Sequence, residues 1–189
     1  KTAARAQTIL GVVQDVTAEM VERHRIEYER DYDVLTNLLN RRAFQRFAQE
    51  RFEHPEQLKI TAFLMMDLDN LKYINDYYGH DSGDEYIRAL ADVLRGFIAP
   101  DSLAAHMVGG EFYLFIKGDS RAKIQSRISD FEKAVQNTQM RLPGGETQKL
   151  RLSAGIAWYP EDADDYQQLI RYADFTLYRA KRTTRGRFV

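Results

Sequence analysis

The sequence contains no cysteine, which excludes disulfide bonds, thiolate catalysis and zinc–thiolate sites. It also lacks an excess of charge of either sign. Its 27 Lys and Arg residues face 28 Asp and Glu residues, and this balance argues against a nucleic-acid-binding or membrane-surface protein. No apolar run approaches the roughly 20 residues of a membrane span, and no signal peptide is visible. We therefore expect a cytoplasmic protein with no nucleic-acid partner and no membrane segment in this sequence.

The composition is that of an ordinary globular protein. Of the 189 residues, 44% are hydrophobic and 29% are charged. These values suit one α/β domain with a short appendage and a core of useful size. The sequence begins with Lys1 rather than Met, so we expect it to be part of a longer protein.

The first 32 residues read as an appendage to the main domain. Residues 9–16 are rich in β-branched side chains and predict a short strand. Thr17 can cap a charged helix over residues 17–32. This helix fits the seam of a coiled coil through which two copies would dimerise, and it fits equally a solvated connector. Its larger side chains form a narrow stripe at i, i+4 spacing: Met20, Val21, His24 and Tyr28.

From Asn40 onward, hydrophobic periodicity predicts the order α-β-α-α-β-β-α-β-α. No glycine-rich phosphate loop follows the first strand, which argues against a Rossmann or P-loop unit. The fold class is therefore α/β (α+β), with a mixed central sheet that contains an antiparallel hairpin and is flanked by helices. The expected segments are 41–53, 59–69, 70–80, 83–98, a hairpin within 104–115, 121–140, 148–160 and 165–182.

Two carboxylates stand at the end of the apolar strand 59–69. Asp67 and Asp69 are two residues apart, so they share a face of the strand and can both project from one edge of the sheet. Hard oxygen ligands at such an edge suit Mg²⁺. The alternative is that these are ordinary polar residues where a buried strand reaches the surface, which is common. The D-x-D pattern alone favours that alternative.

The residues that follow change this balance. The segment MDLDNLKYINDYYGHDSGD, residues 66–84, resembles the nucleotide-binding segment of the diguanylate cyclase (GGDEF) family, whose pattern is D-x-D-x-F-K-x-x-N-D-x-x-G-H-x-x-G-D. Leu71 replaces the usual Phe, and the other signature positions match. DVLTNLLNRRAF at 33–44 looks like the family's entry segment, with Asn37 in place of a glycine. Asn tolerates the left-handed conformation, so this replacement is mild.

The resemblance extends to the C-terminal part of the sequence and defines the expected domains. SAGIAWYPEDADDYQQLIRYADFTLYRAK, residues 153–181, looks like the family's closing strand, loop and helix. We assign residues 33–189 to a GGDEF domain with the nucleotidyl-cyclase, palm-like fold. GVVQDVTAEMVERHR is similar to the end of a PAS sensor domain running into a signalling helix. We therefore assign residues 1–16 to the tail of a PAS-like domain and 17–32 to a signalling coiled-coil helix.

Membership of this family would imply both chemistry and partners. The family condenses two GTP molecules into cyclic di-GMP, with one GTP held by each subunit of an antiparallel homodimer. By resemblance, Asp67 and the backbone carbonyl of Leu68 would bind Mg²⁺ or Mn²⁺ together with Glu111 from the hairpin. Glu111 and Lys72 would be the catalytic residues.

The nucleotide would be held by a second set of residues. By resemblance, Asn75 and Asp84 would bind the guanine edge, and this discriminates well because a wrong base leaves buried polar groups unpaired. Lysines would neutralise the triphosphate, since phosphoryl transfer relies on positioning and charge neutralisation. Arg185 or Arg187 could assist these lysines by resemblance, but we favour the interpretation of both as solvated charges. The expected nucleotide-binding residues are Lys72, Asn75, Asp84, Gly109 and Lys181.

The hairpin departs from the family pattern G-G-(D/E)-E-F. Residues 108–112 read Val-Gly-Gly-Glu-Phe. In a gap-free alignment Val108 replaces the first glycine and Gly110 replaces the acid, and a one-residue deletion removes the same acid. In the family this acid and the strand-end Asp bind the metals and help activate the attacking 3′-hydroxyl. We expect its loss to cost on the order of a thousandfold in rate. A β-branched residue at Val108 also disfavours positive φ.

Two further positions near the hairpin differ from the family. Its inhibitory product site, R-x-x-D, corresponds to the Ala-Pro-Asp-Ser of residues 99–102, which has no arginine. We therefore expect no feedback by cyclic di-GMP at that place. His106 stands where the family often has Arg, and we interpret it as structural.

Three functional hypotheses follow. The first is a degenerate GGDEF domain that binds GTP and relays a signal between an upstream PAS-like sensor and a downstream domain such as an EAL phosphodiesterase. The second is an active diguanylate cyclase, in which Glu111 or Asp69 completes the metal site. The third is a dimerisation or interaction module that needs no nucleotide. The kept pair Asn75 and Asp84 argues against the third.

Overall fold

The computed structural model describes residues 20, 23 and 28–189. The strand expected over 9–16 lies outside the described residues, and so does most of the helix expected over 17–32. Residues 28–31 are helical, and the rings of Tyr28 and Tyr32 stack with their centroids 4.6 Å apart. No helix in the part of the chain that the structure describes is long and apolar enough to cross a membrane.

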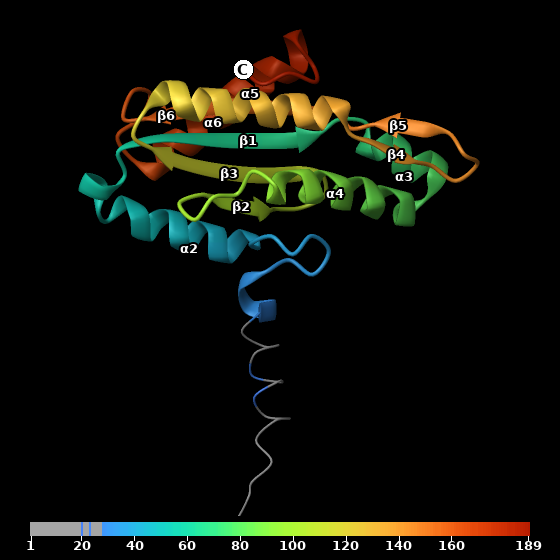
Figure 1. Cartoon of the computed structure of the whole chain (residues 1–189), viewed down its shortest axis with the longest axis horizontal. Helices are drawn as coiled ribbons and strands as arrows, with labels where there is room; N and C mark the ends of the chain where they lie inside the picture. Colours follow the sequence, from blue (N-terminus) through green and yellow to red (C-terminus); the bar gives the residue numbers. More distant parts are fainter. Residues whose placement is uncertain (1–19, 21–22, 24–27) are drawn as a thin grey trace, which may run out of the picture.

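The described chain forms a mixed α/β domain (Figure 1). The predicted order of elements from Asn40 onward is confirmed, with a short 3₁₀ helix and a small two-stranded sheet in addition. The helices are α2 (Arg41–Phe52), η1 (Pro55–Gln57), α3 (Leu71–Tyr78), α4 (His80–Arg95), α5 (Arg121–Asn137) and α6 (Tyr166–Thr183). The strands are β1 (Ile60–Leu68), β2 (Leu103–His106), β3 (Glu111–Gly118), β4 (Gln139–Arg141), β5 (Thr147–Lys149) and β6 (Leu152–Tyr159).

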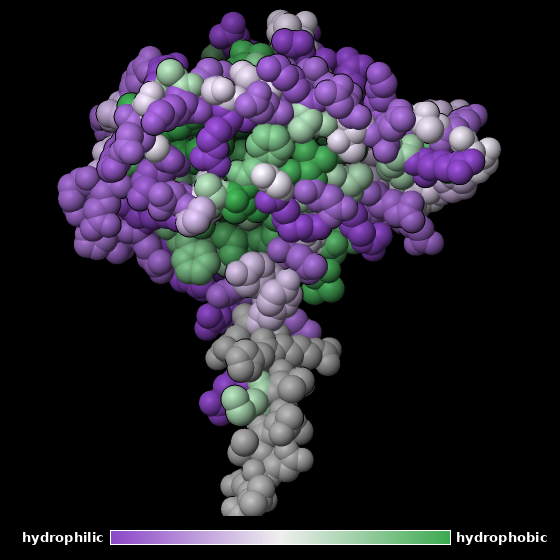
Figure 2. Space-filling view, viewed as in Figure 1, coloured by the Kyte–Doolittle hydropathy of each residue, from purple (hydrophilic) through white to green (hydrophobic). Residues whose placement is uncertain are grey.

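The main sheet has the order β2-β3-β1-β6, and its pairs are antiparallel. Helices lie on both sides of it (Figure 1). Alternate residues of β1 face opposite ways, as a strand requires: Leu64 and Met66 pack against α4 and α5, and Phe63 and Met65 pack against α2 and α6. Both faces of β1 are therefore buried, which explains its nearly continuous apolar sequence. On the face shown in Figure 2, apolar residues gather in the centre and hydrophilic residues cover the rim.

One expected strand is divided in two. The segment 148–160 was predicted as a single strand, but β5 pairs back onto β4 and β6 begins only at Leu152. Two hydrogen bonds explain the break: Leu150 N donates to Thr138 O at 2.9 Å, and Arg151 N donates to the Tyr86 hydroxyl at 3.0 Å. Leu150 is thereby drawn into the core beneath the small sheet.

Helix α6 lies unusually close to strand β6. A Cβ atom built on Gly155 would meet Ala173 O and Leu177 N, both at 2.2 Å. The backbone of the helix therefore packs directly on the backbone of the strand, which only a glycine permits at this position. This contact fixes the distance between α6 and the sheet. It therefore also fixes the position of the side chains at the C-terminal end of α6.

We expect Gly155→Ala to lower the free energy of unfolding by about 2 kcal/mol or more, because the new methyl group must push backbone atoms apart. Urea denaturation followed by circular dichroism measures this. Gly96→Ala is the control, since Gly96 has an ordinary helical φ of −66° and its Cβ would meet only Val93 O at 3.3 Å. Equal losses in the two variants would contradict the close packing of α6.

Candidate functional site

A depression of about 380 Å³ lies where β1 ends. Its wall comes from four parts of the chain: the end of β1, the start of α3, the turn between β2 and β3, and the C-terminal end of α6. Two acidic and three basic side chains line it. These lining side chains are Asp67, Asp69, Lys72, Lys181 and Arg185, and Gly110 lies beside them. The depression therefore combines hard oxygen donors with cations, which suits a bound phosphate and its metal ion.

Asp67 is half-buried and forms an ion pair with Lys181. The Oδ2 atom of Asp67 lies 2.7 Å from Lys181 Nζ, and the two side chains are 24% and 33% exposed. Asp67 stands opposite Glu111 on β3 and opposite Ser153 on β6. Its side chain therefore projects on the α6 side of the sheet, where the packing of α6 delivers Lys181.

Asp69 has a different role from Asp67. Its side chain is 1% exposed, its Oδ2 accepts a hydrogen bond from Ser153 Oγ at 2.8 Å, and its Oδ1 lies 3.3 Å from Arg185 Nε. Burial raises the pKa of the Asp69 carboxyl, while the hydrogen bond from Ser153 and the charge of Arg185 lower it. Asp69 thus joins β1 to β6 and to the C-terminal segment. Arg185 is 59% exposed, as expected of a solvated charge, but it also pairs with Asp69 and lines the depression.

Asn75 and Asp84 meet at the corner between α3 and α4. Gly79, with a φ of +85°, makes that corner. A Cβ atom built on Gly83 would meet Asn75 Oδ1 at 1.8 Å, so the amide of Asn75 lies directly against the backbone that carries Asp84. Both side chains are half-buried. Asn75 also follows Leu71 by one helical turn on the same face of α3, so this polar pair continues the depression along that helix.

The turn between β2 and β3 places its left-handed residue at Gly109. Gly109 has a φ of +57°, and Glu111 N donates to Val108 O at 3.0 Å, closing a tight turn. Among the described residues the non-glycine positions with positive φ are Asn37, Lys59 and Asn70. The expected backbone conflict at Val108 is therefore wrong, whereas the expectation that Asn37 takes the left-handed conformation is confirmed by its φ of 56°.

Gly110 lies next to the end of β1 and carries no side chain there. Its carbonyl oxygen accepts a hydrogen bond from Leu68 N at 2.9 Å. A Cβ atom at this position would meet Leu68 Cβ at 3.1 Å and Leu71 Cδ2 at 3.3 Å. A side chain at position 110 would therefore start between Leu68 and Leu71, at the wall of the depression. In this chain that position supplies no oxygen donor beyond its backbone.

Glu111 is exposed and faces the same side of the sheet as Asp67, because the two residues are directly paired across antiparallel strands. It does not occupy the place that a side chain on Gly110 would take, since neighbours along a strand project to opposite faces. Within residues 20, 23 and 28–189, no cluster of three or more His, Asp or Glu side chains is arranged to hold a metal ion.

A buried histidine ties the turn to the segment that enters the domain. His106 Nδ1 lies 2.9 Å from Asp33 Oδ1, and His106 Nε2 lies 2.9 Å from the carbonyl oxygen of Gly109. Asp33 also accepts hydrogen bonds from the backbone and hydroxyl of Thr36. Burial raises the pKa of the Asp33 carboxyl, but the bonds from Thr36 and His106 outweigh it and hold that pKa below its ordinary value. The structure thus gives His106 the structural role expected of it.

The structure brings most of the expected site residues to one place. Asp67, Leu68, Lys72 and Lys181 line the depression, and Gly109 and Glu111 flank Gly110 in the adjoining turn. Asn75 and Asp84 stand together farther along α3 and α4. Sequence reasoning missed Ser153 and the contact that Arg185 makes. Neither carries a local signal, because both reach Asp69 from segments distant in the sequence.

Comparison with known proteins identifies relatives of this chain. The family model described as "Diguanylate cyclase, GGDEF domain" matches residues 30–187. "Diguanylate cyclase TpbB" of Pseudomonas aeruginosa is 36% identical over 169 residues, which cover 87% of this chain and 38% of that protein. "Cyclic di-GMP phosphodiesterase PdeR" of Escherichia coli is 31% identical over 177 residues, which cover 92% of this chain and 26% of that protein. The chain thus spans well under half the length of these relatives.

The fold is also found in solved structures. The coiled coil and GGDEF domain of DgcB from Caulobacter crescentus, in complex with c-di-GMP, superposes with a TM-score of 0.80 at 26% identity. The match covers 92% of this chain and 93% of that one. The expected palm-like architecture is therefore confirmed.

We expect His106→Ala to lower the free energy of unfolding by about 1–3 kcal/mol, because the Gly109 carbonyl and one Asp33 oxygen each lose a buried hydrogen-bond partner. Thermal and urea denaturation measure the loss. The control is His80→Ala, since His80 is exposed on α4 and a change there should move stability only slightly. An unchanged free energy of unfolding in the His106→Ala variant would contradict the structural role of this residue.

Proposed function

Because this chain belongs to the diguanylate cyclase GGDEF-domain family, we propose that it is a regulatory domain that binds GTP with Mg²⁺ and has weak or no cyclase activity. It belongs to a cyclic di-GMP signalling protein. The observation that carries the proposal is Gly110, which leaves the wall beside Leu68 and Leu71 without the carboxylate that the family pattern has at this position.

The residues present suit one Mg²⁺ better than two. Asp67, the Leu68 carbonyl and Glu111 are hard oxygen donors and would hold one ion, which would neutralise phosphate charge when bound. Asp69 is not available for a second ion, because Ser153 and Arg185 already occupy its two oxygens. Mn²⁺ has the same donor preference.

The cations and the polar corner suit the nucleotide. Lys72 and Lys181 lie where a triphosphate would need neutralising, and Lys181 would exchange its contact with Asp67 for one with phosphate. Asn75 and Asp84 would hydrogen-bond the guanine edge, at the corner that Gly79 and Gly83 create. Phosphate binding and base recognition are therefore supported by residues other than the missing acid.

The signalling context of the proposal comes from the sequence. We propose a homodimer formed through the helix of residues 17–32, an upstream PAS-like domain and a downstream domain such as EAL in the full-length protein. In that arrangement the GGDEF domain would bind GTP and relay a signal from the upstream domain to the downstream domain. Cytoplasmic localisation is part of the same proposal.

A second function has one observation in its favour. Glu111 is exposed and paired directly with Asp67, so two carboxylates lie on the same face of the sheet at the end of β1. In the cyclase alternative this pair holds the catalytic metal without help from position 110. The two functions differ in turnover and agree on GTP binding, so separate measurements distinguish them.

We expect isothermal titration of the chain with GTP and Mg²⁺ to show binding, and Asn75→Ala and Asp84→Ala each to weaken it by about tenfold or more, because guanine groups lose their partners. Asp81→Ala is the matched control, because Asp81 is an exposed carboxylate on the same helix as Asp84 and lies at a variable position of the family pattern. ATP should bind much more weakly than GTP. Absence of GTP binding to the unaltered chain would contradict the proposal.

We expect Gly110→Asp to raise cyclic di-GMP formation by about a hundredfold over the unaltered chain, because it restores an oxygen donor at the wall of the depression. Chromatography after incubation with GTP and Mg²⁺ measures the product. Gly110→Asn is the control, since its Cβ makes the same close contacts with Leu68 and Leu71 but carries no charge. Fast turnover by the unaltered chain would overturn the regulatory proposal and establish the cyclase alternative.

A further inference from the structure

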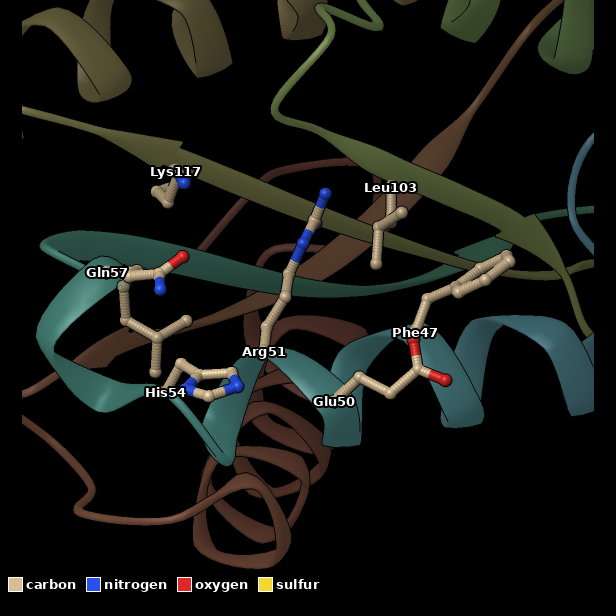
Figure 3. A pocket seen from close by; sticks show the side chains of 8 residues that line it. Phe47, Glu50, Arg51, His54, Gln57, Leu103 and Lys117 are labelled. Atoms are coloured by element: carbon tan, nitrogen blue, oxygen red, sulfur yellow. The ribbon is translucent and has the colours of Figure 1, made fainter.

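A second cavity of about 390 Å³ lies between α2 with η1 on one side and strands β2 and β3 on the other (Figure 3). Its apolar wall includes Phe47, Leu58 and Leu103. Arg51 extends from α2 toward the strands, and its guanidinium end lies between Lys117 and Leu103 in the view of Figure 3. The cavity thus combines an apolar lining with two basic side chains.

This cavity is separate from the depression at Asp67. Lys117 is paired with Thr61 at the start of β1, whereas Glu111 is paired with Asp67 at its end. The positions 111 and 117 lie about 20 Å apart at the usual rise of about 3.3 Å per residue. A ligand in the cavity would therefore not touch the residues proposed to bind nucleotide.

The guanidinium of Arg51 is held in place without an acceptor for one of its nitrogens. Its Nη1 atom is buried, and no described residue accepts a hydrogen bond from it. The group lies over the ring of Phe115, 5.5 Å from the ring centroid. Burial lowers the pKa of this guanidinium from its ordinary value, and the charge of Asp101 raises it. A buried cationic donor without a partner in the chain costs free energy and calls for an explanation. Arg51 also lines the cavity, so an anion bound there would lie beside its guanidinium.

The neighbouring charges leave room for an anion. The carboxylate of Glu50, also in the wall, is 3.9 Å from Arg46 and points away from the tip of Arg51 in Figure 3. Asp101 lies 3.9 Å from Lys117, and its side chain is 70% exposed. The side chain of Lys117 is 23% exposed. Two cations therefore line the cavity with one acid, Glu50, while Asp101 is not among the lining residues.

We propose that this cavity binds a small molecule with an oxyanion head, a carboxylate or phosphate monoester, and a flat apolar body. Arg51 receives the oxyanion, because a guanidinium donates parallel N–H bonds to two oxygens of such a group. Lys117 adds a second positive charge. The apolar body lies against Phe47, Leu58 and Leu103, in a volume typical of small-molecule sites. The proposal does not rest on nucleotide binding.

The test is a titration of the full chain, without GTP, followed by ¹H–¹⁵N NMR. The probes are phenyl phosphate, benzoate and inorganic phosphate. We expect saturable shifts of the amides of Arg51, Leu103 and Lys117, and none at Asp67 or Gly110. Phenyl phosphate or benzoate should bind more tightly than inorganic phosphate, and the tighter of the two identifies the head group. Absence of saturable shifts at the cavity with all three probes would overturn the proposal.

Variants separate recognition from folding. Arg51→Gln should weaken binding of the tighter probe by about tenfold, and Arg42→Gln, an exposed position on the same helix, should leave it unchanged. Without probe, Arg51→Met should be at least as stable as the unaltered chain, because it removes the unpaired donor. The probe should raise the melting temperature of the unaltered chain and should not raise that of Arg51→Met. If Arg51→Gln does not fold, Lys117→Gln provides the same comparison. Equal binding in the cavity variants and the control would overturn the assignment.

Discussion

The site depends on where strand β1 ends between β3 and β6. This register sets Asp67 opposite both Glu111 and Ser153, so polar side chains from three strands lie together where β1 ends. The backbone of α6 rests on Gly155 of β6, and this close packing carries Lys181 to within 2.7 Å of Asp67. The buried core on both faces of β1 holds this edge rigid, as a binding site requires.

A chain of polar contacts connects this edge to the segment that enters the domain. Asp31 pairs with Arg46 of α2, and Asp33 contacts His106, whose other ring nitrogen reaches the Gly109 carbonyl. The turn that presents Gly110 is therefore tied to residues 31–33 through side chains and not only through the core. A displacement of the entering segment would reach the turn by a short physical route, which is what a relay between domains needs.

The sequence predicted the order of elements well, because each helix and strand carries its own periodicity. It predicted Asn37 correctly for a local reason, since few residues accept the left-handed conformation.

The sequence-based prediction failed where a residue's conformation or contact depends on a segment distant in the sequence. Residues 148–160 alternate like one strand, yet the Tyr86 hydroxyl interrupts them at Arg151. Val108 looked strained, but Gly109 takes the positive φ. Arg185 is exposed as expected, yet it also reaches Asp69. The unpaired donor of Arg51 likewise has no signature in the sequence.

The charge balance of the depression gives a physical basis for the proposal that this chain binds GTP but turns it over weakly. Asp67 and Asp69 each hold a cationic side chain already, so the chain itself neutralises its carboxylates. A carboxylate at position 110 would start between Leu68 and Leu71 and would add a negative charge and an oxygen donor to the wall of the depression. Gly110 adds neither. In the proposed complex a triphosphate would compete with Asp67 for Lys181 and would gain attraction from Lys72, which favours the ground state. On the regulatory proposal, the step that needs charge neutralised at the reacting phosphate would lack one oxygen donor, so the loss would fall on the transition state in particular.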